Sequence, residues 1–443
     1  MEEKNSEKKE RKMRDSGIPW IGEVPEGWGI GRIKDIIDVL TDFTANGSFA
    51  DLAKNVKYID DEDYARLIRL TDLRDNLNNT GVFVDENSYS YLSKSKLFGG
   101  EILVANVGAY AGLFCEMPII NKPATLGPNM FLLKPNKKML NRYLYYIGIS
   151  PLVLGQLTEK STSSAQPKLN KTDIKTTYIL IPPLDIQQKL VSFLDSKCSE
   201  IDTLIENLRA RMESAKEYKK AVITEAVTKG LNKDVKMKDS GVEWIGEIPE
   251  NWSNSRVKYE IIPLQRPVKN NDLIVTCFRD GTVTTRQNRR EEGFTISLTE
   301  NGYHGVNVGD LVIHGMDAFA GAIGCSDSRG KITPVVHVCK TMGNNRFFMF
   351  LLRSMAMNDV LMSYSECIRI RSSDYRNFNK LGKFSIAVPP VNEQSRIADY
   401  LDSKCSEIDA LLQNYEDQIT TLEEYKKSLI YEYVTGKKEV PAA

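Results

Sequence analysis

The chain has 443 residues, 41% apolar and 27% charged, and its 59 basic residues balance 59 acidic ones. This composition is ordinary for a globular protein, and no uncharged apolar run is long enough to span a membrane. Zero net charge argues mildly against a protein that simply coats nucleic acid, although basic residues confined to loops could still line a groove. The seven cysteines form no CxxC pair, so neither a disulfide nor a zinc site is expected.

The chain begins with a charged run, residues 1–12, which lacks the apolar core of a signal peptide, so a cytoplasmic location is expected. A leader follows at residues 15–28, with Asp-Ser-Gly, Trp-Ile-Gly-Glu and a final Trp, and it recurs at residues 239–252. A recurring pattern of this length indicates an internal duplication. The predicted segments are 1–28 (first leader), 29–181 (first insert), 182–236 (central helical region), 237–252 (second leader), 253–388 (second insert) and 389–443 (C-terminal helical region).

The two inserts share little obvious sequence but have the same layout. Gly100–Val104 and Gly309–Ile313 each predict a turn that leads into a buried strand. A helical stretch follows around residues 142–157 or 346–364, then a polar loop and a last strand at 178–181 or 384–388. Most of the difference in length falls before the buried strand. The inserts are therefore predicted to be two copies of one α+β fold with different loops.

The polar loops carry the residue types that read DNA, since Arg and Lys suit phosphates or guanine, Asn and Gln suit adenine, and Ser or Thr suit either. The candidates in the first insert are Lys160, Ser161, Thr162, Ser163, Ser164, Gln166 and Lys168. Those in the second are Arg286, Gln287, Asn288, Arg289, Arg290, Arg369, Arg371, Tyr375, Arg376, Asn377 and Lys380. A solvated charged face is the competing interpretation of each loop. The three histidines, all in the second insert, are expected in the core or in loops.

The nine residues LDSKCSEID occur at 194–202 and 401–409, each behind a Pro-Pro pair and each within a long helical stretch. Apolar residues at spacings of four and three predict a coiled-coil seam in both copies, and we expect the two helices to pack together. The seam residues are Leu194, Ile201, Ile205, Leu208 and Met212, and Leu401, Ile408, Leu412, Tyr415 and Ile419. Lys219 and Lys426 interrupt the seam at matching places, and Asp185 and Asn392 are predicted helix caps. The predicted helix pair is interpreted either as a spacer between the two inserts or simply as an assembly contact.

These leaders, Pro-Pro joints and LDSKCSEID helices resemble the specificity subunit of type I restriction-modification systems over the whole chain. The resemblance implies an α+β fold, with two target-recognition domains separated by a pair of long antiparallel coiled-coil helices in pseudo-two-fold symmetry. It implies that each domain reads one half of a split site in double-stranded DNA. It also implies that the helices set the spacer and dock two modification (methyltransferase) subunits, which in turn support restriction subunits. The first joint departs from the family pattern, because only the second carries the Glu-Gln pair, Glu393-Gln394.

No motif for catalysis is found. The chain lacks the Asn/Asp-Pro-Pro-Tyr/Phe pocket of an adenine methyltransferase, a Walker loop, GxGxxG and HExxH. We therefore expect no catalytic residue and no metal site, with S-adenosylmethionine, ATP and Mg used only by partner subunits. Glu217-Tyr218-Lys219 and Glu424-Tyr425-Lys426 superficially resemble a nuclease motif, but a place in the seam is favoured. A protein-interaction scaffold and a diverged DNA methyltransferase or nuclease stay open as alternatives.

Overall fold

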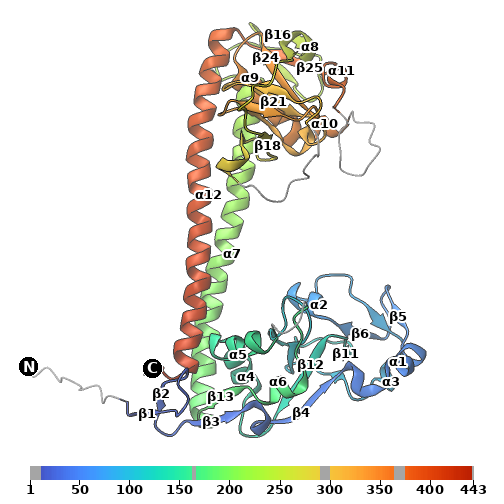
Figure 1. The fold of residues 1–443 in the computed structure, drawn as a ribbon, viewed down its shortest axis with the longest axis vertical. Coiled ribbons are helices and arrows are strands. Elements are labelled where there is room, and N and C mark those ends of the chain that lie inside the picture. Colours follow the sequence, from blue (N-terminus) through green and yellow to red (C-terminus); the bar gives the residue numbers. More distant parts are fainter. Residues whose placement is uncertain (1–10, 162–165, 290–299, 364–374, 442–443) are drawn as a thin grey trace, which may run out of the picture. The chain divides into compact units, whose positions relative to one another are not determined.

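The computed structural model describes residues 11–161, 166–289, 300–363 and 375–441. It divides into two compact units, Met1–Asn207 with Gln418–Ala443, and Leu208–Asp417. Each unit holds one α+β domain together with one segment of each of the two long helices, α7 (Leu184–Lys229) and α12 (Val391–Val434) (Figure 1). The predicted α+β class with two long helices is confirmed. No helix in the described ranges is both long and apolar enough to cross a membrane.

The two domains contain the same four-stranded antiparallel sheet in the same strand order. In the first domain the order is β10 (Phe114–Glu116), β9 (Ile102–Ala105), β12 (Met130–Pro135) and β4 (Ile37–Asp42). In the second it is β22 (Ile323–Cys325), β21 (Leu311–His314), β24 (Val336–Thr341) and β17 (Ile261–Leu264). The central strands β9 and β21 are the predicted buried strands. The prediction of one fold in two copies is confirmed.

Each sheet packs against helices whose apolar residues form the domain core. These helices are α4 (Asn141–Ile149) and α5 (Pro151–Ser161) in the first domain, and α9 (Asn345–Met357) and α10 (Val360–Ser363) in the second. A two-stranded ribbon joins the start of each domain to its end. The ribbons are β3 (Gly29–Arg32) with β13 (Tyr178–Ile181), and β16 (Ser253–Arg256) with β25 (Ser385–Val388). Short helices flank the ribbons: η1 (Ile33–Asp35) and α6 (Lys171–Lys175), then α8 (Val257–Glu260) and α11 (Phe378–Leu381).

The domains differ in the segments that precede and flank the central strand. The first has a second sheet, in the order β5 (Tyr58–Ile59), β7 (Phe83–Val84), β6 (Ala65–Ile68), β11 (Ala124–Leu126) and β8 (Lys96–Leu97), with α1 (Phe49–Asn55), α2 (Leu70–Arg74), α3 (Glu86–Tyr91) and η2 (Phe43–Asn46). The second has two strand pairs, β18 (Val275–Cys277) with β19 (Val283–Thr285), and β20 (His304–Val306) with β23 (Gly330–Ile332), besides η3 (Arg286–Asn288) and η4 (Ala318–Ala320). The length difference therefore falls where it was predicted.

The repeated leaders form small hairpins that end on a buried tryptophan. The strands are β1 (Met13–Asp15) with β2 (Glu23–Pro25), and β14 (Met237–Asp239) with β15 (Glu247–Pro249). A Cβ on Gly436 would lie 3.2 Å from the ring of Trp28, and one on Gly230 would lie 3.3 Å from the ring of Trp252. Both glycines have a positive φ and follow the end of a long helix. The first leader thus packs against the end of α12, from the far end of the chain, and the second against the end of α7, which directly precedes it.

The long helices begin two residues earlier than the predicted caps imply. Gln187 N donates to Pro183 O at 2.9 Å, and Gln394 N donates to Pro390 O at 3.0 Å, so the second proline of each pair accepts the first helical hydrogen bond. Asp185 and Asn392 lie within the first turn, and their prediction as caps is wrong. A proline already has a helix-compatible φ, so the turn can start directly behind it.

In both units the helix segments run antiparallel, as predicted. In the first unit the Phe193 and Tyr433 ring centroids are 4.5 Å apart and Lys426 Nζ lies 2.6 Å from Asp202 Oδ2. In the second, Lys219 Nζ lies 2.6 Å from Asp409 Oδ1. Leu194, Ile201, Ile205, Leu208, Leu401 and Ile408 are buried, and Met212, Leu412, Tyr415 and Ile419 are half-buried. Since both lysines are engaged across the seam, Glu217-Tyr218-Lys219 and its repeat are structural.

One set of hydrogen bonds, present in both units, joins each domain to its long helix. The Gln187 side chain accepts from Leu140 N (2.9 Å) and donates to Pro182 O (2.8 Å), and Gln394 does the same with Asn344 N and Pro389 O. The departure from the family's Glu-Gln pair at the first joint therefore leaves the bonding residue in place.

An arginine at the second position of α4 or α9 adds an ion pair to this junction. Arg142 Nε lies 2.7 Å from Asp195 Oδ1, and Arg346 Nη2 lies 2.6 Å from Asp399 Oδ1. Arg346 also contacts Asp402, the repeat equivalent of Asp195. Each domain is thus held to its helix at the same residues.

Candidate nucleic-acid interface

In each domain three loops meet at the end of the central strand. In the first domain they are residues 106–112, which follow β9, residues 166–169, and residues 74–81. Gly108 N donates to Pro167 O at 2.9 Å and Leu169 N donates to Asn106 O at 2.8 Å, which joins the first two loops. The guanidinium of Arg74 stacks on the ring of Tyr110 at 4.0 Å, which brings in the third. Cationic, amide and aromatic side chains are thereby gathered from three parts of the sequence.

The second domain repeats the arrangement with residues 315–321, 375–377 and 278–289. Tyr375 N donates to Gly315 O at 2.7 Å. Arg279 Nη2, from the turn between β18 and β19, lies 2.9 Å from Asp317 Oδ1. The two domains therefore place two equivalent loops together, after the central strand and before the last strand, and each adds a third loop from the segment that differs between them.

The loop that follows the central strand carries a signal that sequence reasoning missed. It reads Ala-Tyr-Ala-Gly at 109–112 and Ala-Phe-Ala-Gly at 318–321, with the same separation from the start of β9 or β21. Gly112 and Gly321 have φ values of 94° and 90°, which few other residues adopt. Comparison of the two inserts at this position would have found the motif without a structure.

Several predicted DNA contacts lie on these loops and are exposed. They are Gln166 and Lys168 in the first domain, and Gln287, Asn288, Arg289, Arg376 and Asn377 in the second, with Lys380 exposed nearby on α11. Some also have structural contacts: Asn377 caps α11 and Asn288 Nδ2 donates to Thr284 Oγ1 at 2.9 Å. Arg286 is half-buried, and its Nε donates to Thr276 Oγ1 at 3.3 Å.

Arg289 forms an ion pair inside the interface of the second domain. Its Nη2 lies 2.6 Å from Asp280 Oδ2, and its guanidinium lies 4.3 Å from the centroid of the Phe278 ring. Burial opposes ionisation of Asp280, but hydrogen bonds from Arg289 and Thr282 outweigh it and lower the pKa of Asp280 to about 2. The carboxylate is therefore ionised at neutral pH and holds Arg289 in position.

Ser161 and Tyr375 were predicted to contact DNA, and this prediction is wrong because both side chains are buried in the domain. Their exposed fractions are 4% and 2%, and their hydroxyls donate to Thr158 O and Leu361 O within the same domain. Thr162, Ser163, Ser164, Arg290, Arg369 and Arg371 lie outside the described residues.

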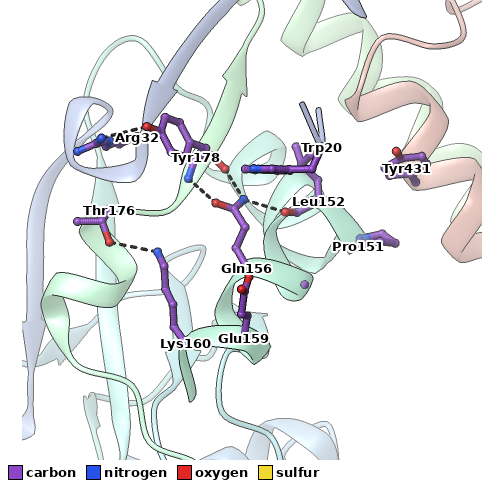
Figure 2. Close-up of a pocket in the computed structure, with 11 residues that line it drawn as sticks. Trp20, Arg32, Pro151, Leu152, Gln156, Glu159, Lys160, Thr176, Tyr178 and Tyr431 are labelled. Carbon is purple, nitrogen blue, oxygen red and sulfur yellow. Dashed lines mark hydrogen bonds between the residues drawn. The ribbon is translucent and has the colours of Figure 1, made fainter. Parts of the chain in front are cut away.

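Lys160 lines a different feature, a pocket of about 710 Å³ in the first unit (Figure 2). Its Nζ donates to Thr176 Oγ1 at 3.1 Å and to Thr177 Oγ1 at 3.0 Å, and burial lowers the pKa of its ammonium group. Beside it Gln156 makes two hydrogen bonds of 2.9 Å to the backbone of Tyr178. These polar side chains bond within the pocket wall, so Lys160 is also reassigned from DNA contact to domain support.

Two of the three histidines have the core or loop environment that was predicted for them. His304 is buried, and His314 Nδ1 accepts a hydrogen bond from Asp317 N at 3.1 Å. Within the described ranges, no group of three or more His, Cys, Asp or Glu side chains could hold a metal ion.

The chain is similar to known proteins in both sequence and fold. Residues 25–214 match the family model described as the type I restriction modification DNA specificity domain. Among curated proteins, the MjaX specificity subunit of Methanocaldococcus jannaschii is 27% identical over 52% of this chain and 52% of its own length. The MjaVIII specificity subunit of the same organism is 26% identical over 55% of this chain and 51% of its own length. The chain spans about half the length of these relatives.

A solved chain from a study of complex assembly and conformational transition in the type I R-M system has a TM-score of 0.67 to this chain. It is 14% identical, and the match covers 94% of this chain and 99% of that one, which shows a shared fold. The family model thus places a type I restriction modification DNA specificity domain over residues 25–214. The chain is similar to specificity subunits of type I restriction-modification systems, as the resemblance of its leaders and helices indicated.

Proposed function

We propose that the chain reads a split site in double-stranded DNA, with each domain contacting one half-site through its three loops. One observation carries this proposal: the same sheet and the same two loops, after the central strand and before the last strand, recur in both domains, while the loop side chains and the third loop differ. A shared framework with different loops is what two readers of different sequences require. The exposed Arg, Lys, Asn and Gln side chains on these loops suit phosphates and base edges.

Two modification subunits would dock on the helix segments. Large apolar side chains are exposed at repeat-equivalent positions of the helices: Leu204 (52%) and Leu411 (42%), and Tyr218 (58%) and Tyr425 (54%). Single exposed apolar residues are common, but the same pair in each unit suits two copies of one partner. Restriction subunits would join through the modification subunits.

The chain itself would carry no catalytic activity. S-adenosylmethionine, ATP and Mg would be used by the partner subunits, and the complex would work in the cytoplasm. The paired helices would set the distance between half-sites. Removing residues 208–214 and 414–420, one heptad from each long helix, should shorten the spacer by roughly 10 Å, or about three base pairs.

Exchange of one domain tests the proposal. Residues 29–181 are replaced by the matching domain of a relative, the chain is produced with its modification subunits, and methylated sites are mapped on genomic DNA. We expect a two-part motif with a fixed gap in which only one half changes. Change in both halves, or in neither, contradicts the modular proposal.

The dependence of binding affinity on salt concentration distinguishes the DNA-reading proposal from the protein-scaffold alternative. A DNA complex that involves phosphate contacts loses affinity steeply as salt rises, whereas a mostly apolar protein interface responds weakly. Incubation of the chain alone with DNA, S-adenosylmethionine and magnesium tests the methyltransferase and nuclease alternatives, and methylated or cleaved product would support them.

A further inference from the structure

The loop of residues 75–81 in the first domain has an unusual backbone. Asn76 and Leu77 are consecutive and both have a positive φ, 48° and 61°. Left-handed geometry is unfavourable for residues with a Cβ and is rare in two successive ones, so other contacts must hold it. Such strain occurs at functional sites more often than elsewhere.

Arg66, on β6, stabilises this loop through hydrogen bonds. Its Nη1 donates to Leu77 O at 3.0 Å, and its Nη2 donates to Asn79 Oδ1 at 2.6 Å and to Asn79 O at 3.1 Å. Gly81 covers the same guanidinium, because a Cβ at this position would lie 2.9 Å from Arg66 Nε.

Asp72 adds a second set of bonds. Its Oδ1 accepts from Asn79 Nδ2 at 2.8 Å, and its backbone oxygen accepts from Leu77 N at 2.8 Å. Asp72 is fully buried and is itself paired with Arg69 at 2.9 Å. The loop is thus fixed through its backbone and through Asn79, which leaves two other asparagine side chains outside this network.

Those side chains, Asn76 and Asn78, are exposed. Arg74, just before the loop, stacks on Tyr110, and the Tyr110 loop is hydrogen-bonded to the loop of Pro167 and Lys168. Both asparagine side chains are therefore exposed on a loop that adjoins the candidate interface. An amide can donate and accept at once, which matches the N6 and N7 groups of adenine in the major groove.

We propose that Asn76 and Asn78 are specificity-determining residues of the first domain, that they read adenine in its half-site, and that Arg66 is the positioning residue for their loop. This rests on the proposed function, because it assigns base contacts within the same DNA-reading surface. The rigid loop reduces the entropy lost when its side chains bind.

The test uses the full chain assembled with its modification subunits and a library of duplexes with random sequence. The bound duplexes are sequenced, and the enriched motif is compared for wild type, Asn76→Ala, Asn78→Ala and Arg66→Lys. Asn87→Ala, an exposed asparagine on α3, is the matched control. Thermal unfolding of each variant is recorded in parallel.

We expect each asparagine variant to lose preference for adenine at one position of one half-site, with a fall in affinity of about 5- to 150-fold. Arg66→Lys should weaken the base preference at the same positions and leave the preference at the other half-site unchanged. The control should select the wild-type motif.

An unchanged motif in both asparagine variants overturns the inference and leaves the proposed function intact, provided that wild type selects a two-part motif. Loss of assembly with the modification subunits, without a change of motif, would make the loop a protein-docking element and also overturns it. Failure of wild type to enrich any motif counts against both.

Discussion

The two domains share a framework but hold their interface loops by different means. In the first, Arg66 bonds the backbone and amide of a strained loop, and the side chains presented are neutral asparagines. In the second, Arg279 and Arg289 lie in the interface and are paired with Asp317 and Asp280. The duplicated domains thus keep the same core and the same contacts to the long helices, while their loops carry different side chains and are stabilised by different bonds. Four predictions test how far this equivalence extends.

The largest effect is expected in the cores. Tyr143 and Phe347, each at the third position of α4 or α9, are fully buried in equivalent places. Truncation of either to alanine should lower the free energy of unfolding by about 3 to 5 kcal/mol. Hydrogen exchange should show lost protection in the unit that carries the change. Equal loss in both units would show that they do not act as separate cores.

A smaller effect is expected at the junction of domain and helix. Arg142→Met removes the contacts to Asp195 and Glu116, and Arg346→Met removes those to Asp399 and Asp402. Since all these side chains are partly exposed, we expect a loss of about 1 to 2 kcal/mol in unfolding free energy, measured by denaturant titration. A loss in only one of the two would break the equivalence of the junctions.

Replacing the seam lysines should act in the opposite direction. Lys219→Leu with Lys426→Leu loses two half-exposed ion pairs, worth little, and gains apolar contact in the seam. We expect the free energy of unfolding to rise by about 1 kcal/mol, seen as a higher melting temperature. A lower melting temperature would mean that the lysines stabilise the helix pair through their charge.

The smallest effect is a dependence of stability on pH, which is expected in the second domain only. All three histidines lie in the second domain, and burial lowers the pKa of His304 and of His314 below the usual 6.5. The folded state therefore favours the neutral rings, so their contribution to stability is complete above about pH 6.5 and is lost as the pH falls through the folded pKa. Hydrogen exchange between pH 7.5 and 5.5 should show weakening in the second domain alone. His304→Gln should reduce it.

Much of the framework could be predicted because repetition and periodicity are local properties of a sequence. The seam at Leu194 and Leu401, the central strands and the last strand at 178–181 all follow from spacing of apolar residues. The predicted cap positions were wrong by two residues, because the second proline of each pair accepts the first helical hydrogen bond. Lys160 and Ser161 were misjudged because a polar run does not reveal which of its side chains turn inward.

The sequence by itself determined that this protein is duplicated, that its helices carry one seam, and that its two domains share a fold, since these rest on repeated residues and on periods of 3.5 and 2. Only the tertiary structure decided which loops meet. Arg74 lies beside Tyr110, and Gly108 bonds to Pro167, because segments far apart in sequence meet in the same domain. Such contacts depend on the register and packing of whole sheets, and no single segment encodes them.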